Sequence, residues 1–437
     1  MLTRPCQAEI DLAAFAHNLQ RLQRIAAQAT LAAIVKSDAY GHSLALCAPA
    51  AVQTGASWLA VTSTDEALAA FHACAQTQTS LRALPRILVL SGPFPGDGEA
   101  VARHGFTCSV WQRNHLEELQ RGARAVGPAR TPVHLEIETG MNRQGIALDD
   151  LPAFLALLPA FPALHLDGVM THLYAADEGD HLATNRQLKQ LEAGLRGISD
   201  WVAATGTEKP KWLSVGSSAA LLDGLVREHL MAMATAHQMR LLLRPGLALY
   251  GIAPEFDPLP QPDASPRPDA CPVLAASSDH LLPVLRWTTR ITTLRHIAPG
   301  EVVGYNGTFR ASQPMRLALI AAGYADGLSR KLSHRGHALV AGQQAPYAGR
   351  ISMDQAVIDV TRIPEEGVRI GDEVVLLGSQ NQAEQGRQGP GQASVTAQDH
   401  ARWAETIPWE IFTSIASRVT RLAKPQRREA DRGYTRW

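Results

Sequence analysis

The sequence lacks the features of two broad classes of protein. It has no unbroken apolar stretch of the roughly 18 residues that a membrane span requires, and Glu9 and Asp11 interrupt the segment where a signal peptide would need an apolar core. It also has no excess of charge of one sign, because 41 Lys and Arg residues balance 41 Asp and Glu residues. Since nucleic-acid-binding proteins usually carry a basic excess, we expect neither a membrane nor a nucleic acid as partner.

Cysteine is scarce as well. The five cysteines are scattered, form no Cys-x-x-Cys pair, and fit neither a disulfide framework nor a zinc site. The His-Glu-x-x-His and acidic-loop patterns of other metal sites are also missing, so the sequence predicts no metal. A reducing compartment follows from this cysteine usage, and we expect a cytoplasmic protein.

The length of 437 residues favours two or three domains at about 150 residues each. A proline-rich segment at 253–272 excludes both helix and central strand and marks a linker or long loop. The Gly- and Gln-rich segment 378–394 is typical of a surface loop. We therefore expect an N-terminal domain at 1–252, a linker or inserted loop at 253–285, a second domain at 286–425 and a basic tail at 426–437.

Before the linker, buried strand patterns alternate with amphipathic helical ones. Apolar runs at 31–35, 86–90, 133–137 and 166–172 are separated by helical patterns such as 12–26, 65–75 and 183–198. Eight such units need about 200–250 residues, so a (β/α)8 barrel of the TIM type is favoured over an open doubly wound sheet. After the linker, Val-, Ile- and Thr-rich runs at 285–297, 315–322, 337–342, 355–361 and 372–378 predict a mostly β domain.

Active sites of such barrels lie at the carboxyl ends of the strands, so residues just past each strand are candidates for chemistry. Lys36 directly follows the first predicted strand. A partly desolvated lysine at a barrel mouth can act as a nucleophile, although a single lysine at a strand end is also a common surface charge.

The residues around Lys36 resemble the pyridoxal-phosphate attachment motif of alanine racemases. The resemblance continues through six more motifs in the family's order and covers about residues 7–420. The seven motifs are Ala33–His42, Glu138–Gly145, Thr171–Leu173 with Ala176–Glu178, Arg244–Gly251, Gly304–Phe309, Gly323–Gly327 and Gly349–Asp354.

This resemblance implies a barrel that binds pyridoxal 5'-phosphate, a C-terminal β domain and a homodimer with shared active sites. It implies a racemase that interconverts L- and D-alanine and supplies D-alanine for cell-wall peptidoglycan. Lys36 would form the internal aldimine and act as base on one face of the substrate, and the partner's Tyr305 would act on the other. Tyrosine is a weak base near pH 7, so His172 and Arg244 are its expected neighbours.

Arg244 would face the pyridine nitrogen of the cofactor, according to the resemblance. A guanidinium does not give up its proton to that nitrogen, which then stays neutral. A neutral ring withdraws electrons less strongly, which disfavours transamination and suits simple removal and return of a proton.

The remaining site residues are also implied by the resemblance. Arg143 would meet the substrate carboxylate, and Glu136 stands where some members carry a carbamylated lysine that orients this arginine. Two departures are Ser217, where the family commonly has Asn, and Ser417, where some members have a tyrosine near the cofactor phosphate. The other expected cofactor residues are Tyr40, Ser218, Gly246, Leu247 and Tyr250, and the other expected substrate residues are Met353, Asp354 and Tyr324.

Three alternative functions follow from the same pattern. The open position at Ser417 allows a racemase of broader specificity. A decarboxylase on the same barrel would carry a Gly-rich phosphate loop and a Cys-containing motif in the β domain, and neither is present. A non-catalytic pyridoxal-phosphate carrier would be a lone barrel, whereas this chain has a second domain with Tyr305 and Met353–Asp354.

Overall fold

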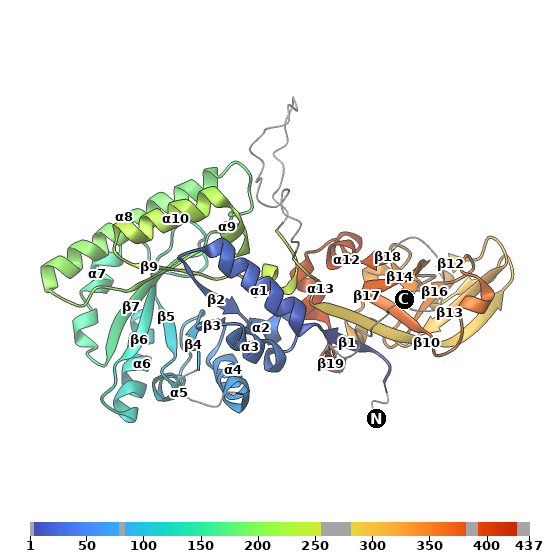
Figure 1. The fold of residues 1–437 in the computed structure, drawn as a ribbon, viewed down its shortest axis with the longest axis horizontal. Coiled ribbons are helices and arrows are strands. Elements are labelled where there is room, and N and C mark those ends of the chain that lie inside the picture. Colours follow the sequence, from blue (N-terminus) through green and yellow to red (C-terminus); the bar gives the residue numbers. More distant parts are fainter. Residues whose placement is uncertain (1–3, 78–83, 255–280, 382–391, 426–437) are drawn as a thin grey trace, which may run out of the picture. The chain divides into compact units, whose positions relative to one another are not determined.

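The computed structural model describes residues 4–77, 84–254, 281–381 and 392–425. It divides into two compact units (Figure 1). The barrel unit comprises Ala14–Ala39 and Leu44–Leu282, and the β unit comprises Met1–Ala13, Tyr40–Ser43 and Pro283–Trp437.

Eight parallel strands close the barrel unit, each paired with the next in chain order and the last paired with the first. This confirms the predicted (β/α)8 barrel. The strands are β2 (Thr30–Ile34), β3 (Trp58–Val61), β4 (Arg86–Val89), β5 (Thr107–Val110), β6 (Thr131–Glu136), β7 (Leu164–Met170), β8 (Trp212–Ser214) and β9 (Arg240–Leu243).

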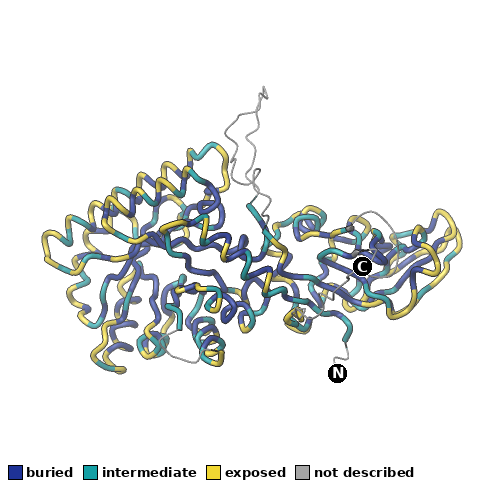
Figure 2. Tube along the Cα trace, viewed as in Figure 1, coloured by how far each residue is buried: buried dark blue, intermediate teal, exposed yellow. Residues whose placement is uncertain are grey.

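Helices connect these strands. Most of the helices have one buried and one exposed face, whereas the strands are buried almost throughout (Figure 2). In α1, the apolar side chains of Phe15, Leu19 and Leu22 recur every three or four residues and are fully buried. The helices are α1 (Leu12–Ala26), α3 (Leu44–Gln53), α4 (Thr64–Thr77), α5 (Gly98–His104), α6 (Arg113–Val126), α7 (Leu151–Leu155), α8 (Leu182–Thr205), α9 (Ser218–Leu222) and α10 (Gly224–Ala236).

The β unit is built on a nine-stranded sheet, which confirms the predicted mostly β second part. Its long strand β10 pairs with β1, β13 and β17, so it forms the centre of the sheet. The strands are β1 (Gln7–Ile10), β10 (Leu285–Ile297), β13 (Met315–Ile320), β14 (His337–Val340), β15 (Gln343–Pro346), β16 (Ala356–Asp359), β17 (Glu373–Asn381), β18 (Gln392–Val395) and β19 (Thr420–Ala423).

The structure differs from the sequence predictions in three places. Residues 7–10 form β1, which pairs with β10 and β19 in the β unit instead of belonging to the barrel. The predicted loop at 378–394 is partly wrong, since β17 continues to Asn381 and β18 begins at Gln392. The β unit also contains two helices, α12 (Ala397–Ala404) and α13 (Pro408–Ser414). Most of the predicted linker, 255–280, and the basic tail lie outside the described residues.

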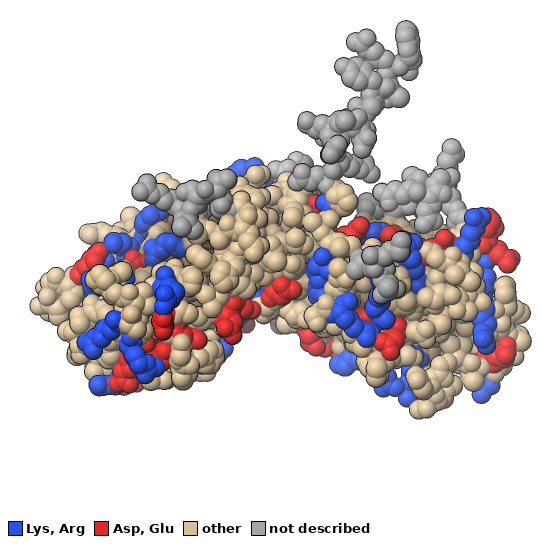
Figure 3. All heavy atoms as spheres, turned by 90° about the horizontal axis from the view of Figure 1, so that it is seen from below, with Lys and Arg blue, Asp and Glu red and all other residues tan. Residues whose placement is uncertain are grey.

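Charge is well mixed over the surface that Figure 3 displays. Blue Lys and Arg side chains alternate with red Asp and Glu side chains on both units, without a large patch of one sign. None of the described helices is long and apolar enough to cross a membrane.

Candidate active site

Predicted site residues from four different strands gather at the carboxyl end of the barrel. Lys36 follows β2, Glu136 ends β6, His172 follows β7 and Arg244 follows β9. Because parallel strands all end at the same rim, residues far apart in sequence meet there. Lys36 and Arg244 both lower the pKa of His172, and Glu136 raises the pKa of Arg244, as expected for groups at one rim.

The backbone after Lys36 forms a left-handed turn. In α2 (Lys36–Tyr40), Ser37, Asp38 and Ala39 have φ angles of 52–55° and ψ angles of 47–51°, and Tyr40 has a φ of 54°. Left-handed conformation costs about 1–2 kcal/mol per residue that carries a side chain. Four such residues in a row mean that the surrounding structure must hold this turn in place.

Two carboxylates bind the backbone of this turn. Glu66, in the first turn of α4, accepts a hydrogen bond from Ser37 N at 2.6 Å and another from Thr62 N at 2.7 Å. At the other end of the turn, Asp38 Oδ1 accepts from Leu44 N at 2.7 Å. The loop that carries Lys36 is thereby tied to the end of β3 and to the start of α3.

The electrostatic surroundings favour the neutral forms of Lys36 and His172. Burial lowers the pKa of Lys36, and the charges of Arg143 and Arg244 lower it further, whereas Glu66 raises it. Burial, together with Arg244, Arg143 and Lys36, lowers the pKa of His172 to about 3. A lysine with a lowered pKa is a better base and nucleophile at neutral pH, and His172 stays uncharged there.

Arg244 is buried and held by three hydrogen bonds. Its Nη1 donates to Ser214 Oγ at 2.8 Å and its Nη2 donates to Thr171 O at 2.8 Å. Its backbone N also donates to Gly216 O. Burial lowers the pKa of Arg244 to about 10, partly offset by Glu136, so the guanidinium stays charged at neutral pH.

The predicted phosphate-binding residues come together at the starts of two short helices. Ser218 Oγ accepts hydrogen bonds from Gly246 N at 3.0 Å and Ala248 N at 3.2 Å, while Ser217 precedes α9. Leu247 begins the 3-10 helix η3 (Leu247–Tyr250). This arrangement fixes the Ser218 hydroxyl beside the backbone of Gly246–Ala248, with the amides of Gly246 and Ala248 bonded to that hydroxyl.

Two predicted cofactor residues, both tyrosines, are buried. The Tyr250 hydroxyl donates to Ile34 O at 2.8 Å, so it supports the strand end that precedes Lys36. Burial raises the pKa of the Tyr40 hydroxyl to about 12, so it stays protonated and able to donate a hydrogen bond.

Glu136 and Arg143 line one small cavity of about 10 Å³ together with His172. The hydrogen-bond partner of Glu136 is Gln144, whose Nε2 donates to Oε2 at 2.7 Å, and no direct ion pair joins Glu136 to Arg143 within the described part of the chain. Burial raises the pKa of Glu136 to about 7, although Gln144, Arg244 and Arg143 lower it. Its charge therefore changes near neutral pH.

Two of the predicted site residues in the β unit, Tyr324 and Met353, lie side by side. Tyr324 N donates to Ser352 O at 3.0 Å and Ala325 N donates to Met353 O at 2.9 Å, which places Tyr324 beside Met353. A Cβ on Gly323 would lie 2.4 Å from Met353 O, so only glycine allows this approach. Tyr305 is 66% exposed and Met353 is 53% exposed, so both side chains are available to another molecule.

Asp354, the fourth predicted residue in the β unit, belongs to an ion-pair network. Its Oδ1 accepts from Arg418 Nη2 at 2.7 Å, and Arg418 Nε donates to Asp326 at 2.8 Å. Arg4 donates two further bonds to Asp326, which is fully buried. Burial by itself would raise the pKa of Asp326, but the bonds from Arg4 and Arg418 outweigh it and lower that pKa.

The amino-terminal end of the barrel contains charged groups of a different kind. Asp167 on β7 accepts from Arg86 Nη2 at 2.6 Å, and the Arg86 guanidinium lies 4.0 Å above the Trp58 ring. Burial alone would raise the pKa of Asp167, but His134, His165 and Arg86 hold it well below its usual range.

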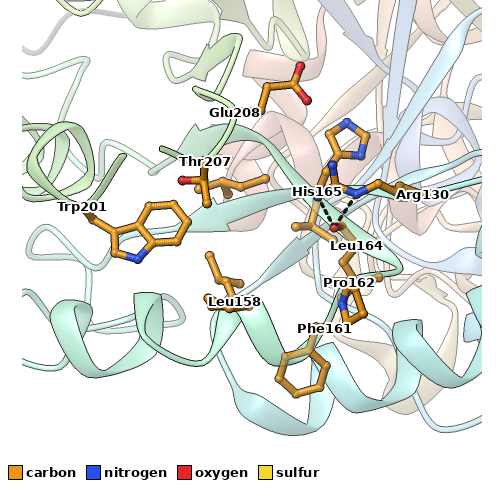
Figure 4. A pocket seen from close by; sticks show the side chains of 12 residues that line it. Arg130, Leu158, Phe161, Pro162, Leu164, His165, Trp201, Thr207 and Glu208 are labelled. Carbon is orange, nitrogen blue, oxygen red and sulfur yellow. Dashed lines mark hydrogen bonds between the residues drawn. The ribbon is translucent and has the colours of Figure 1, made fainter. Parts of the chain in front are cut away.

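A cavity of about 110 Å³ lies at the same end, lined by Phe161, His165 and Trp201 among others (Figure 4). At its edge, Arg130 Nε and Nη2 both donate to Leu164 O. None of the predicted site residues lines this cavity. Separately, the described residues contain no group of three or more His, Cys, Asp or Glu side chains able to hold a metal ion.

Sequence reasoning missed three residues that the structure brings to the candidate site. Glu66 contacts the site from the first turn of α4, and Ser214 contacts it from the end of β8, a strand of three residues that is too short to be recognised in the sequence. Arg418 contacts Asp354 across 64 residues. A signal was available for Glu66, because it follows the apolar run at 58–61 by a few residues.

Comparison with known proteins follows the same division of the chain. The family model of the alanine racemase N-terminal domain matches residues 10–254, and that of the C-terminal domain matches residues 284–423. The alanine racemase of Sorangium cellulosum is 37% identical over 427 residues, which cover 96% of this chain and 99% of that protein. The alanine racemase of Syntrophobacter fumaroxidans is 36% identical over 416 residues, with 93% and 94% covered.

Solved structures show the same fold. The alanine racemase of a D-cycloserine-producing Streptomyces lavendulae superposes with a TM-score of 0.77 at 31% identity, over 98% of each chain. The alanine racemase of Bartonella henselae, solved with covalently bound pyridoxal phosphate, gives a TM-score of 0.73 at 26% identity, over 96% of this chain and 99% of that one. Both matched domains, the relatives and the common fold lead to one conclusion: this chain belongs to the alanine racemase family.

Proposed function

We propose that this chain interconverts L- and D-alanine and holds pyridoxal 5'-phosphate at the carboxyl end of its barrel. The observation that carries the proposal is the placement of Lys36, with a pKa lowered by burial, at the same rim as His172 and Arg244. That placement occurs in a chain of the alanine racemase family. D-alanine for the cell wall would be the product.

The residues at this rim fit the proposed cofactor. Lys36 supplies an amine for its aldehyde, and Arg143 and Arg244 supply positive charge for its anionic groups. Ser217, Ser218 and the backbone of Gly246 and Leu247 would hold the phosphate, with Tyr40 donating to it. When bound, the cofactor supplies an electron sink that makes the α-proton of an amino acid acidic.

Two bases on opposite faces of the substrate are needed to invert its α-carbon. Lys36 would remove or return the proton on one face, and the partner subunit's Tyr305 would do so on the other. Arg244, charged at neutral pH, would keep the ring nitrogen unprotonated, and neutral His172 would accept a hydrogen bond in the chain of groups beside Tyr305.

Arg143 would bind the substrate carboxylate, and Met353 and Asp354 of the partner subunit would line the site of that carboxylate, with Tyr324 at the entrance. Glu136 would orient Arg143 through its charge and not through direct contact, because its hydrogen bond goes to Gln144. Arg143 lies beside Glu136 and His172 along the same small cavity, which supports this assignment.

A homodimer with shared sites completes the proposal. The strong exposure of Tyr305, Met353 and Tyr324 on the β unit supports their use by a second chain. Cys6, Cys47, Cys74 and Cys108 are all buried free thiols, which fits a reducing cytoplasmic location. We retain the proposed boundary between a first domain that ends near 252 and a second at 286–425, except that strand β1 belongs to the β unit.

The test of the activity is a circular-dichroism assay of the purified protein against a panel of L-amino acids, with its visible spectrum recorded first. We expect alanine to lose its optical activity fastest. Borohydride reduction followed by peptide mapping should find the cofactor on Lys36. Attachment to a different lysine, or no cofactor at all, would overturn the assignment.

The shared site is tested by mixing two inactive variants, Lys36→Ala and Tyr305→Phe, and allowing subunits to exchange. A mixed dimer contains one site with both native residues and one with neither. Random exchange makes half of the dimers mixed, so activity should recover to about a quarter of the wild-type value. No recovery, with exchange confirmed by native mass spectrometry, would rule out a shared site.

A second candidate is a racemase of broader specificity on the same scaffold. Ser417 is a small, exposed residue where some family members carry a tyrosine, which favours a roomier pocket. The same panel of amino acids decides between the two, since comparable rates with larger side chains would support the broader specificity.

A further inference from the structure

We propose that Glu66 is a positioning residue for Lys36, whose carboxylate both holds the left-handed turn after this lysine and sets the charge beside its amine. The inference rests on the proposed function, because it takes Lys36 as the reactive lysine. It adds a residue on α4 that the motif around Lys36 does not contain.

Both oxygens of Glu66 are engaged with backbone of the barrel rim. Oε1 accepts from Ser37 N at 2.6 Å and Oε2 accepts from Thr62 N at 2.7 Å. Thr62 directly follows β3, the strand next to the one that carries Lys36. One side chain therefore joins the ends of two neighbouring strands and fixes the residue that follows Lys36.

The turn depends on the hydrogen bonds to Glu66 because its backbone is strained. Ser37, Asp38 and Ala39 all have positive φ angles, a conformation that persists only where the surroundings impose it. Glu66 binds the start of the turn, and Asp38 binds its end through Leu44 N. Without the bonds of Glu66, the first residues of the turn would be free to relax to a right-handed conformation, and Lys36 would lose its fixed direction.

Glu66 also differs in sign from the other charges that act on Lys36. Arg143 and Arg244 approach from the segments after β6 and β9 and lower the pKa of Lys36, whereas Glu66 raises it. His172, on the segment after β7, is neutral, and Glu136 titrates near pH 7. Glu66 thus limits how far the two guanidinium groups lower the pKa of the lysine.

The first test is the Glu66→Gln variant, which keeps the length of the side chain and one acceptor oxygen but loses the charge. The full-length chain is freed of cofactor with hydroxylamine, and the rate of labelling of Lys36 by an amine reagent is followed by mass spectrometry against pH. We expect the midpoint of the profile to move to lower pH and labelling at neutral pH to become several-fold faster. An unchanged midpoint would overturn the proposed effect of charge.

Two matched variants separate this effect from a general loss of structure. Glu118 on α6 also accepts two backbone hydrogen bonds, from Gly96 N at 3.1 Å and Gly98 N at 2.9 Å, in another loop of the same barrel. Both bonds go to Oε1, so Glu118→Gln can keep them while it removes a charge elsewhere in the barrel, and it should leave the Lys36 profile unmoved. Asp38→Asn keeps the bond to Leu44 N and removes a charge in the turn itself, and it should leave the midpoint in place as well.

The second test is hydrogen exchange on the enzyme as purified. Glu66→Ala removes both acceptors, so the backbone amides of 37–41 should exchange at least several-fold faster than in the wild type. Unchanged exchange there would overturn the role of Glu66 in holding the turn. If Glu66→Ala does not fold, the same measurement is made on Glu66→Gln, which cannot satisfy both amides.

Failure of this inference is distinguishable from failure of the proposed function. If peptide mapping of the wild type finds the cofactor on a lysine other than Lys36, the proposed function fails. If the cofactor is on Lys36 and neither the pH profile nor the exchange of 37–41 responds to Glu66, the proposed function stands and the positioning role is wrong.

Discussion

The charged groups at the two ends of the barrel have opposite environments. At the amino-terminal end, Asp167 and Arg86 form a direct ion pair, and Trp58 covers the guanidinium. At the carboxyl end, Lys36 and Arg244 are desolvated, and neither forms an ion pair among the described residues. Paired charges contribute to stability, whereas desolvated charges without a partner are costly and displace pKa values from their usual ranges.

The comparison shows where this fold uses its polar residues for structure and where for chemistry. The same eight strands run through both ends of the barrel. The two ends therefore differ only in the side chains that the sequence places near the start of each strand and just after its carboxyl end. An anionic ligand would supply at the carboxyl end the compensation that Asp167 supplies at the other. Four variants test this division.

Lys36→Ala should have the largest effect. It removes the proposed base and point of cofactor attachment, so racemisation should fall by roughly a thousandfold or more. Stability should change little, because Lys36 is only partly buried and lies among positive charges. Circular dichroism of L-alanine measures the first effect and urea denaturation the second. A large loss of stability would mean that the carboxyl end is structural after all.

Asp167→Asn should show the opposite pattern. It breaks the ion pair with Arg86, and we expect a loss of about 2 kcal/mol in the free energy of unfolding, less than for a fully buried pair because Arg86 is partly exposed. The rate of racemisation by the remaining folded enzyme should stay the same. Reduced turnover with unchanged urea midpoint would contradict the comparison.

Groups at the two ends of the barrel should affect the stability of the protein over different ranges of pH. The pKa of His172 is lowered from 6.5 to about 3, so between these values the unfolded chain binds more protons and stability falls as the pH falls. The pKa of Asp167 lies below its usual 3.8, so its contribution is present above that value and is lost in stronger acid. His172→Gln should therefore flatten the pH profile of the urea midpoint from 6.5 down to 3, whereas Asp167→Asn should change its shape only below about pH 4. Parallel profiles for wild type and His172→Gln would contradict a buried neutral histidine.

Glu136→Gln should have the smallest effect. The pKa of Glu136 is raised to about 7, so the wild-type side chain is charged above that pH and neutral below it. Glutamine mimics the neutral form, so KM for alanine should rise about threefold at pH 8.5 and stay unchanged at pH 5.5. Steady-state kinetics at the two pH values, with kcat as the control, give the result. An equal change at both values would show that charge is not what matters at this position.

The part of the fold that could be predicted rests on patterns that are local in sequence. Continuous apolar runs predicted β2, β4, β6 and β7, and helical spacing predicted α1 and α8. The strands β3, β5, β8 and β9 were not predicted, because a run of three or four residues does not by itself distinguish a strand from a helix segment. The equally short β4 was predicted because Leu90 continues its apolar run. Strand β1 escaped because its partners lie more than 270 residues away.

The candidate site likewise contains residues that local motifs could predict and residues that they could not. The positions of Lys36 and Arg244 at the barrel rim could be predicted because each follows a predicted strand or lies within a recognisable motif, whereas the role of Tyr305 stays a prediction. For Glu66 the sequence offered only its place shortly after the apolar run at 58–61, and the roles of both Glu66 and Arg418 depend on which backbone or side chain they meet in space. The left-handed turn could not be predicted either. Ser37, Asp38 and Ala39 include no glycine, and residues with a side chain usually have negative φ angles.

Strand β1 has a consequence for the order in which the chain is built. Its residues leave the ribosome early, yet Ala8 pairs with Trp287 on one side and with Arg421 on the other. At 5–20 residues per second, synthesis of the residues between Ala8 and Arg421 takes about 20–80 s. Strand β1 must therefore wait for β10 and β19, and until it inserts, β10 presents an open edge to neighbouring chains. An N-terminal fusion, although remote in sequence, would act on the closing step of the C-terminal sheet.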